Sequence, residues 1–597
     1  MCRIAGIVNR SQSTGSLKEA VKQMCSVLQH GGPDDEGMFS SEENHLVLGH
    51  RRLSLIDLSS AGHQPMSYAD NRYTISFNGE IYNYLEIKDE LIKKGYQFNT
   101  HSDTEVILAA FAAWGTNSFE KLNGMFAFAL WDNADGNIYL VRDSVGIKPL
   151  YYALTKEGLV FASEVKAFKQ IEYLQEENAN WKVYLMAYGH LPEPVTTLKN
   201  VNHLPKGTYL KYKVSTGEHT LETFWKYSYI EKIGSRDEVI SLVREQLNKA
   251  VQRHMISDAP IGVFLSGGVD SSLIALLASN NGQKDLTTLS LFFDDEKYSE
   301  KKYQDIVQKK LVGHQYQHLL NGKEFNEYFS SVIDVMDQPS CDGINTWFIS
   351  KYAKESNLKA VLSGLGGDEL FGGYPSFNRI KYALLLQKLP NKLLHSTQYA
   401  NSKRLKRLSY LAIPGPIGLY LFLRGQFVPG EIAAYLDISE KEIFNILQAE
   451  PWVPNIDYLT AKNQASWIET NLYMQNQLLR DADVMSMAHG VEIRVPFLDK
   501  DFVNLMLHVK SNIKYGGTTP KQLLIDSFKD ILPEEIWNRP KMGFSFPFKQ
   551  WLSEHAQLKE LMTGNGNKSR ENYQQFISGH LHWSQIVTLL LLQKKDS

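Results

Sequence analysis

The first 200 residues alternate short apolar runs with polar turns, a pattern typical of β-strands. Two stretches, 17–28 and 106–114, instead repeat apolar residues at helical spacing. Ser16 is a candidate N-cap for the first of these helices. Ser102 and Glu105 form a candidate capping box for the second, which puts Asp103 in its first turn. The runs rich in β-branched and aromatic residues predict strands at 4–9, 46–56, 73–77, 126–131, 138–141 and 159–162. This half therefore predicts a layered α+β domain with antiparallel sheets.

From about residue 236 the pattern changes to alternating strands and helices. Apolar runs at 261–265, 286–293 and 360–362 are separated by helical stretches, and the chain beyond residue 376 is mostly helical in pattern. This alternation predicts an α/β domain with a doubly wound parallel sheet, in which ligands bind at the carboxyl ends of the strands. We expect an N-terminal domain at 1–200, a connector with a hairpin at 201–235, and a second domain at 236–597.

Composition excludes several classes of protein. The chain has 597 residues, 43% of them hydrophobic and 22% charged, which excludes wholesale disorder. Its 63 basic and 66 acidic residues give a net charge of −3, so we expect no nucleic acid partner. Three cysteines (Cys2, Cys25, Cys341) exclude a disulfide framework. The absence of an export signal also favours the cytoplasm, and the longest apolar run, 410–423, is too short to span a membrane.

Cys2 is the first candidate nucleophile. If Met1 is removed, Cys2 carries both a thiol and a free α-amine, whose pKa of about 8 is well below that of lysine. The amine can then act as the base for its own thiol, directly or through a water. Taken alone, Cys2 is equally an ordinary cysteine near a chain terminus.

Three downstream segments give Cys2 a chemical context. Arg52, in a predicted strand, can grip a carboxylate in bidentate fashion. The amide of Asn78 and the N–H of Gly79 can point at a developing oxyanion, and Asp103 can bind an α-ammonium group. These groups would hold both ends of an amino acid whose side-chain amide meets the thiol, which predicts glutamine as a substrate.

A second candidate site follows the predicted strand 261–265. The sequence Ser-Gly-Gly-Val-Asp-Ser-Ser at 266–272 offers backbone N–H groups, hydroxyls and a helix N-terminus to phosphate. It lacks the Gly-Lys-Ser/Thr ending of a Walker loop. A further glycine-rich segment, 363–374, follows the strand 360–362. Asp270 and Asp368 are candidate Mg²⁺ ligands, one in each segment.

These motifs resemble those of one enzyme family over nearly the whole chain. The shared positions are Cys2, 30–34, 52–54, 78–80, 102–105, 142–143, 266–271, 479–483 and 492–499. In this order they resemble class II glutamine amidotransferases, specifically the glutamine-hydrolysing asparagine synthetases. The resemblance implies an αββα sandwich of the N-terminal-nucleophile hydrolase type, followed by an ATP pyrophosphatase domain, with ATP and Mg²⁺ as cofactors and a homodimer as the assembly.

The resemblance also implies roles for individual residues. Cys2, Asn78 and Gly79 would be catalytic. Glutamine would be bound by Arg52, Leu53, Ser54, Leu55, Ile56, Asn78, Gly79, Glu80 and Asp103. ATP would be bound by Leu265, Ser266, Gly267, Gly268, Asp270, Ser271, Ser272, Leu291, Ser363, Gly364, Lys521 and Lys541, with Asp270 and Asp368 holding the metal. For the two lysines, a solvated surface position is the alternative interpretation.

The implied reaction has three parts. Cys2 releases ammonia from glutamine, and a substrate carboxylate attacks the α-phosphorus of ATP to give an acyl-AMP. Ammonia then crosses an internal tunnel and displaces AMP, and the tunnel keeps it unprotonated and away from water.

The identity of the amidated acid stays open. Asparagine synthetases usually carry Glu where this chain has Leu365, and an apolar residue cannot act as a base. The segment 336–346 also differs from aspartate-specific members, and its Asp337, Asp342 and Asn345 are candidate acceptor contacts or ordinary polar loop residues. The acceptor is aspartate or another carboxylate of a polysaccharide or secondary-metabolite pathway. A ring-closing ligase like β-lactam synthetase and a non-catalytic glutamine- or nucleotide-binding relative are further alternatives.

Two other features depart from the expected pattern. The family commonly has Gly or Ser where this chain has Arg3, and Arg where it has Gly31, so Arg3 is a candidate spatial replacement for the missing arginine. The segment 376–430 contains nine Lys or Arg residues and no Asp or Glu. With its apolar run at 410–423 as a tip, this segment is either a site of contact with an anionic membrane or a solvated basic face.

Overall fold

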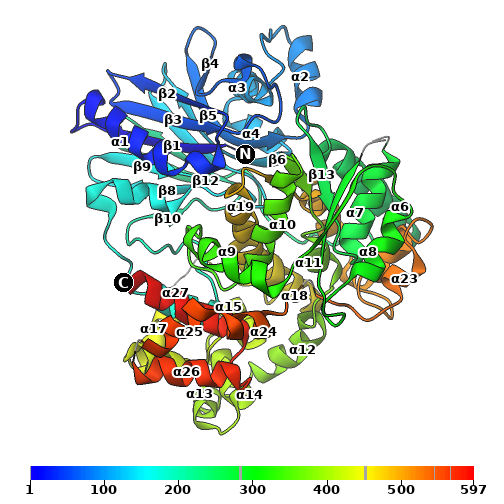
Figure 1. The fold of residues 1–597 in the computed structure, drawn as a ribbon. Coiled ribbons are helices and arrows are strands. Elements are labelled where there is room, and N and C mark those ends of the chain that lie inside the picture. The colour runs from blue at the N-terminus through cyan, green and yellow to red at the C-terminus, as the bar shows by residue number, and fades with distance from the viewer. Residues whose placement is uncertain (1, 282–285, 450–452, 544, 565, 597) are drawn as a thin grey trace.

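The computed structural model describes residues 2–281, 286–449, 453–543, 545–564 and 566–596 of the chain (Figure 1). Two antiparallel sheets occupy the N-terminal half, and one parallel sheet surrounded by helices occupies the C-terminal half. The two-domain arrangement predicted from the change of sequence pattern is therefore present.

The N-terminal half contains two six-stranded sheets whose strand pairs are all antiparallel. The first has the order β10 (Asn202–His203), β8 (Tyr151–Leu154), β9 (Gly158–Ala162), β1 (Arg3–Asn9), β3 (Leu46–Arg52), β2 (Asp35–Ser41). The second has the order β12 (His219–Thr223), β11 (Thr208–Lys213), β7 (Asn137–Arg142), β6 (Gly124–Asp132), β5 (Tyr73–Ile81), β4 (Met66–Tyr68).

Alternation along the strands stacks these sheets into four layers. In β1, Ile4 and Val8 pack between the two sheets, whereas Ala5 and Ile7 face helix α1 (Thr14–Val27). Phe128 of β6 points the other way, into a cluster with α3 (Asp103–Trp114), which also contacts α2 (Tyr84–Lys93). Because side chains in a strand alternate between faces, each sheet has one side-chain set for its partner sheet and one for its helices. The expected α-β-β-α order is confirmed.

The segment expected as a connector extends both sheets instead. Strand β10 pairs with β8 in the first sheet, and the hairpin β11–β12 continues the second sheet beyond β7. These pairs place the chain up to Thr223 with the N-terminal domain, so its boundary lies later than residue 200. Sequence patterning detects the hairpin but not its non-local partner strands.

The structure changes one predicted helix cap and part of the other. The hydroxyl of Ser13, rather than Ser16, caps α1 by accepting a hydrogen bond from the N–H of Ser16. Ser102 does cap α3, and Asp103 lies in its first turn. The carboxylate of Glu105, however, binds the N–H and hydroxyl of Thr100 and does not complete a capping box. The preceding turn offers closer donors than the cap backbone does.

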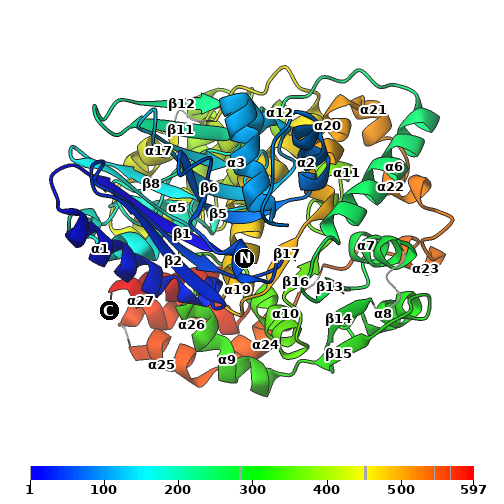
Figure 2. The ribbon, with the colours of Figure 1, turned by 90° about the horizontal axis from the view of Figure 1, so that it is seen from above.

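The C-terminal sheet is parallel throughout. Its order is β15 (Gln315–Leu319), β14 (Thr287–Phe292), β13 (Ile261–Phe264), β16 (Ala360–Leu362), β17 (Glu492–Arg494). The chain proceeds from β13 to one side of the sheet and later returns to its other side as β16, so a topological switch point lies between these two strands. Ligands of such sheets bind at the carboxyl ends of the strands at this point. Figure 2 shows the strands with α7 and α8 nearby.

Helices make up most of the remaining chain. In the N-terminal domain they are α4 (Ser118–Lys121) and α5 (Trp181–Tyr188). Helices of the C-terminal domain before residue 430 are α6 (Arg236–His254), α7 (Val269–Asn280), α8 (Lys301–Gln308), α9 (Gly322–Asp334), α10 (Ile344–Glu355), α11 (Gly367–Phe371), α12 (Ser376–Leu386), α13 (Asn391–Ser396), α14 (Lys403–Lys406), α15 (Gly415–Arg424) and α16 (Pro429–Leu436). Later ones are α17 (Glu440–Gln448), α18 (Ala461–Ile468), the π-helix η8 (Glu469–Leu479), α19 (Arg480–Met487), α20 (Lys500–His508), α21 (Ser511–Lys514), α22 (Gln522–Ser527), α23 (Glu534–Trp537), α24 (Phe548–Glu554), α25 (Ala556–Gly564), α26 (Asn567–Ile577) and α27 (Trp583–Asp596).

The apolar run 410–423 is part of the core. Tyr410, Ile413 and Leu421 are fully buried, and Leu419 is 1% exposed. The run is therefore not an exposed tip. It packs under the neighbouring helices, which agrees with the other interpretation of 376–430, a basic face beside a core helix. No helix in the described ranges is long and apolar enough to cross a membrane.

Candidate active sites

The thiol of Cys2 lies at the start of β1, buried and 8% exposed. Its Sγ lies 3.9 Å from the carbonyl oxygen of Leu53. Burial raises the pKa of the thiol to about 11, although the nearby charge of Arg52 opposes the shift. A buried thiol with this pKa needs a base before it can attack a carbonyl. Met1, whose removal would expose the α-amine as that base, lies outside the described residues.

Asn78 and Gly79 lie on β5, where the strand passes very close to β6. A Cβ on Gly79 would lie 2.1 Å from the carbonyl oxygen of Met125, and its φ of +149° also requires glycine. The side chain of Asn78 is fully buried, yet neither its Oδ1 nor its Nδ2 has a hydrogen-bond partner among the described residues. A buried amide left in this state is costly unless a ligand uses it, which fits an oxyanion donor.

The guanidinium of Arg52 holds a loop in this structure. It donates hydrogen bonds to the carbonyl oxygens of Ser59 at 3.0 Å and Ile56 at 3.4 Å, and also to that of Asp57. The sequence predicted a free carboxylate clamp, whereas these contacts shape the loop after β3. They still position the loop beside Cys2, so Arg52 has a part in the site.

The other predicted glutamine contacts divide into two groups. Leu53 and Leu55 are buried in a cluster shared with the C-terminal sheet, and the N–H of Ser54 binds the carboxylate of Asp34 at 2.8 Å. Asp103 and Glu80 instead lie near the end of β5. The carboxylate of Asp103 accepts the N–H of Ile81 at 2.9 Å, and burial raises its pKa to about 6. Burial also raises the pKa of Glu80, which lies 3.5 Å from the guanidinium of Arg494.

Arg3 occupies the space beside Gly31. A Cβ on Gly31 would lie 2.7 Å from Cγ of Arg3 and 2.9 Å from its Nε. The fully buried guanidinium of Arg3 pairs with Glu164 at 2.5 Å and with Asp483 at 2.9 Å. Arg3 therefore lies where a side chain at position 31 would extend, and it connects the N-terminal domain to α19. Glu164 lies in no motif, and Asp483 lies in the shared segment 479–483 without a predicted role, so neither was among the predicted site residues.

The predicted phosphate loop joins β13 to α7 at the switch point. The hydroxyls of Ser266 and Ser271 lie 2.9 Å apart, and Gly267 has a φ of +90°. Gly268 is the N-cap of α7, which places Asp270, Ser271 and Ser272 in its first turns. Arg539, not predicted as a site residue, donates to the carbonyl oxygen of Gly267 at 2.9 Å and holds the loop from outside.

Asp270 and Asp368, one from each glycine-rich segment, converge on Lys521. Lys521 forms ion pairs with both carboxylates, and Lys541 lies 2.7 Å from Asp368. Burial raises the pKa of both aspartates, but at Asp368 the two lysines outweigh burial and hold its pKa below the usual value. Asp270, Asp368, Lys521 and Lys541 thus form one charged cluster at the carboxyl end of the sheet.

The surroundings of this cluster fit a hard divalent cation. Cβ atoms on Gly367 and Gly373 would lie 2.5 Å from Oδ1 of Asp270 and 1.8 Å from Oδ1 of Asp368. Oδ1 of Asp270 is buried without a hydrogen-bond partner among the described residues. Oxygen ligands in a glycine-lined space match the requirements of Mg²⁺ bound to phosphates.

Four other residues predicted to bind ATP lie near this cluster. The carbonyl oxygen of Leu265 accepts from Ser290 at 2.8 Å, and that of Leu291 accepts from Gln304 at 2.8 Å. A Cβ on Gly364 would lie 2.8 Å from the N–H nitrogen of Ser271, so the two glycine-rich segments pack directly together. The N–H of Ser363 donates a hydrogen bond to the backbone carbonyl oxygen of Arg494 in the neighbouring strand β17.

The four acceptor candidates do not form one group. Both carboxylate oxygens of Asp337 accept backbone N–H groups, from Val165 and Lys166 at 2.8 Å each, so Asp337 joins the two domains. Leu365 is partly buried against the core of the C-terminal domain. Asn345 starts α10, where its Oδ1 accepts the N–H of Thr346.

Asp342 lies close to Arg424, a residue that the sequence did not predict as part of the site. The guanidinium of Arg424 lies 3.6 Å from the ring centroid of Tyr473 and 4.6 Å from that of Tyr374, and Nζ of Lys541 lies 4.6 Å from the Tyr374 ring. Burial raises the pKa of Asp342, and Arg424 opposes that shift. The sequence identifies Arg424 only as one of the basic residues of 376–430, because nothing local in the sequence places it beside the cluster of Asp270, Asp368, Lys521 and Lys541.

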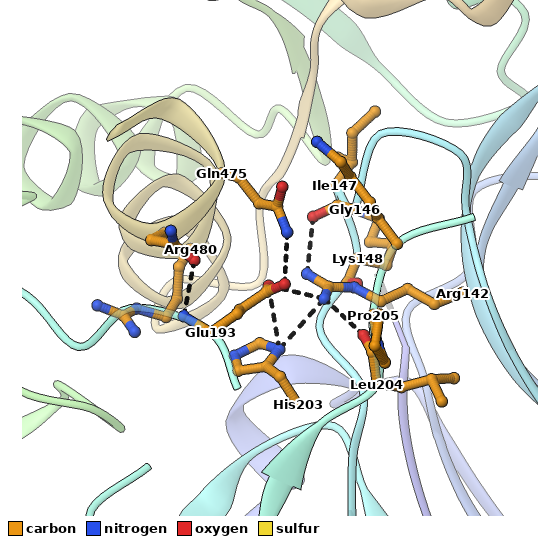
Figure 3. Close-up of polar contacts among 12 residues, drawn as sticks. Arg142, Gly146, Ile147, Lys148, Glu193, His203, Leu204, Pro205, Gln475 and Arg480 are labelled. Carbon is orange, nitrogen blue, oxygen red and sulfur yellow. Dashed lines mark hydrogen bonds and ion pairs between the residues drawn. The ribbon is translucent and has the colours of Figure 1, made fainter. Parts of the chain in front are cut away.

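A second buried network joins the domains beside these sites (Figure 3). The guanidinium of Arg142, at the end of β7, lies 2.7 Å from Glu193 and donates to the carbonyl oxygen of Leu204 at 2.8 Å. Glu193 also binds His203 and Gln475 of the π-helix η8. The network holds the N-terminal sheets and the C-terminal helices in one relative position.

Comparisons with known proteins match both halves of the chain. A family model described as "Glutamine amidotransferase domain" matches residues 1–225, and one described as "Asparagine synthase" matches residues 242–584. The chain is 32% identical to asparagine synthetase [glutamine-hydrolyzing] 1 of Bacillus subtilis, over 92% of this chain and 88% of that protein. The chain belongs to the glutamine-hydrolysing asparagine synthetase family. It is therefore a ligase that uses glutamine, which confirms the predicted enzyme class.

Other members of the family are equally long matches. A putative asparagine synthetase [glutamine-hydrolyzing] of Mycobacterium bovis is 29% identical over 89% of this chain and 85% of that protein. Amidase chry2 of Gibberella zeae is 28% identical over 94% of this chain and 92% of that protein. Proteins with different names thus match this chain at similar identity.

Proposed function

We propose that this member of the family hydrolyses glutamine at Cys2, adenylates an acceptor carboxylate with ATP, and amidates it with the released ammonia. The observation that carries this proposal is the presence of both centres in one chain. The N-terminal domain contains a buried thiol at Cys2 and a buried, unpartnered amide at Asn78, and a carboxylate–lysine cluster lies at the switch point of the parallel sheet.

The glutaminase step follows from the N-terminal geometry. The α-amine of a processed Cys2 takes the thiol proton, and the thiolate attacks the amide carbon of glutamine to form a tetrahedral oxyanion. The amine returns the proton to the amide nitrogen, so that the C–N bond breaks, ammonia leaves and a thioester remains. Water then hydrolyses the thioester to glutamate and frees the thiol. Asn78 Nδ2 and the Gly79 N–H stabilise the oxyanion, and Asp103 binds the α-ammonium group. Arg52 contributes by holding the loop that contains Leu53, Ser54, Leu55 and Ile56 over the thiol.

The synthetase step follows from the cluster at α7. Backbone N–H groups of 266–268 and the N-terminus of α7 receive the phosphates, and Lys521 and Lys541 neutralise the leaving pyrophosphate. Asp270 and Asp368 would hold Mg²⁺, which would supply positive charge to offset the negative charge of the phosphates. Ammonia crosses between the centres through the interdomain core that Leu53, Leu55 and Met125 line on the N-terminal side.

Aspartate is the first candidate acceptor, because the most similar relatives are named asparagine synthetases. A different small carboxylate is the second, and the observation that favours it is Leu365. An apolar side chain at this position removes the group that the family resemblance associates with the acyl-adenylate step. Arg424, Tyr374 and Tyr473 then offer a cation and two aromatic faces to a larger acid.

The deciding experiment is an acceptor panel. The purified, Met1-processed chain is assayed for glutamine hydrolysis and for pyrophosphate release with ATP, Mg²⁺ and a series of carboxylic acids that includes aspartate. We expect pyrophosphate release only with the true acceptor. Absence of thiol-dependent glutamine hydrolysis, or of Mg²⁺-dependent ATP binding, would overturn the proposal. Leu365→Glu should lower turnover of a non-aspartate acceptor, with Leu365→Met as the matched control.

A further inference from the structure

Residues 376–406 form a hairpin of short helices that starts and returns beside the synthetase site. We call this segment the basic hairpin; it contains α12, α13 and α14. Tyr374 immediately precedes α12, and the chain comes back through α15 to Arg424, whose guanidinium lies 4.6 Å from the Tyr374 ring centroid. Figure 1 shows α13 and α14 at the end of the molecule opposite the N-terminal sheets.

The basic hairpin exposes large apolar side chains. On α12, Phe377, Ile380 and Ala383 are buried, whereas Tyr382 and Leu385 on the opposite face are 59% and 66% exposed. The exposed apolar side chains of the hairpin are Tyr382, Leu385, Leu389, Leu393, Tyr399 and Leu405, with exposures from 38% to 78%. Six such side chains lie within 24 consecutive residues, 382–405. Exposed apolar side chains gathered in one segment with polar neighbours are a feature of surfaces that contact a protein or a membrane.

The same segment has one sign of charge. Residues 376–430 contain nine Lys or Arg residues and no Asp or Glu. Among the described residues, Lys403 pairs with Glu431 at 3.2 Å and Arg424 with Glu469 at 2.7 Å. The remaining exposed basic residues, which form no ion pair in the described part of the chain, are Arg379, Lys381, Lys388, Lys392 and Arg404.

We propose that the basic hairpin binds the surface of an anionic lipid bilayer. Apolar side chains flanked by lysine and arginine on an exposed helix are the combination that inserts at the boundary between headgroups and acyl chains. Each unpaired cation adds electrostatic attraction to anionic lipids, which falls off within a Debye length. The net charge of −3 for the whole chain means that this attraction is local to the hairpin.

A bound bilayer would lie close to the synthetase site. Helix α12 begins two residues after Tyr374, has 11 residues and is therefore about 17 Å long, and it carries the exposed side chains of Tyr382 and Leu385. The proposed contact of the basic hairpin with a bilayer does not depend on which acid is amidated. It places the acceptor side of the enzyme toward the membrane rather than the glutaminase side, because the N-terminal sheets lie at the other end (Figure 1).

Vesicle flotation of the full-length chain tests the proposal. The protein is mixed at low salt with vesicles of phosphatidylcholine alone, or of phosphatidylcholine with about one third phosphatidylglycerol. We expect binding to the anionic vesicles only, weakened about tenfold or more when salt is raised to about 0.5 M. Lys388→Glu/Lys392→Glu should abolish binding by charge, and Leu385→Ser/Leu393→Ser should weaken it by removing apolar contact.

Matched variants elsewhere on the surface control for charge and hydrophobicity. Lys309→Glu/Lys310→Glu changes net charge equally, and Leu85→Ser/Ile92→Ser removes two apolar side chains that are 48% and 52% exposed on α2. Both controls should bind like the parent chain, and all variants should keep glutaminase activity as proof of folding. Equal binding to neutral vesicles, no binding to anionic ones, or no effect of the hairpin variants would overturn the proposal. So would a dimer that Leu385→Ser/Leu393→Ser converts to a monomer, because a second copy would then cover this face.

Discussion

The contact between Arg3 and Gly31 predicts that an arginine can be moved from one position to the other. We consider Arg3→Ser, Gly31→Arg and the double variant. In the parent chain the buried guanidinium of Arg3 pairs with Glu164 at 2.5 Å and Asp483 at 2.9 Å. An arginine at position 31 alone would overlap the Arg3 side chain, since its Cβ would lie 2.7 Å from Cγ of Arg3. In the double variant the same space is free for it.

The magnitudes follow from burial of the ions. Removing one partner of a buried ion pair costs about 3–5 kcal/mol, because the remaining charges lose their compensation. For a unit of roughly 200 residues this lowers Tm by roughly 6–20 °C. Overpacking in Gly31→Arg costs about 1–3 kcal/mol. If the arginine at 31 reaches Glu164 and Asp483, the double variant recovers a coupling energy of about 2 kcal/mol.

Thermal unfolding and glutamine hydrolysis measure the two consequences. Each single variant should have a lower Tm and weaker glutaminase activity, because Arg3 directly follows Cys2 in β1. The double variant should regain most of both. If its losses equal the sum of the single losses, the two positions do not share one role. If Arg3→Ser keeps full stability and full glutamine hydrolysis, the replacement hypothesis is wrong.

Three further outcomes are expected. Asn78→Ala should lower kcat for glutamine about 10²–10³-fold with an unchanged fold, since it removes an oxyanion donor, whereas an unchanged kcat would exclude that role. Lys521→Met should abolish pyrophosphate release but leave glutaminase activity intact, and parallel loss of both would indicate misfolding rather than lost charge. The KM for glutamine should rise as pH falls through about 6, because Asp103, whose pKa burial raises to about 6, loses the charge that binds the α-ammonium group. Asp103→Asn should have a high KM that does not change over this pH range, and a pH response retained in this variant would assign the titration to another group.

Local pattern was enough to predict most of the framework. The strands at β1, β6, β9, β13 and β16 were expected within a few residues of their positions, because alternation and β-branched composition are properties of short segments. The loop at 266–272 was also predicted with its strand before and its helix after. Asp270 and Asp368 were paired correctly because the carboxyl ends of neighbouring parallel strands meet at one edge of a sheet.

Other features depended on contacts between distant segments. Strands β10, β11 and β12 joined the N-terminal sheets because β7 and β8 offered free edges. Asp337 became a domain contact when the backbone N–H groups of Val165 and Lys166 met its carboxylate. None of these partners lies at a characteristic sequence spacing, so no local signal could identify them.

The amino-acid sequence alone determined the two chemistries of this protein, because a nucleophile at position 2 and a phosphate loop after a strand are encoded within a few consecutive residues. Only the tertiary structure decided which side chains complete the sites. It buried the apolar run 410–423 while exposing Leu385 and Tyr399, and it brought Arg424 to Tyr374. Burial and ion pairing between remote segments depend on how the whole chain packs, which hydrophobic periodicity within one segment does not specify.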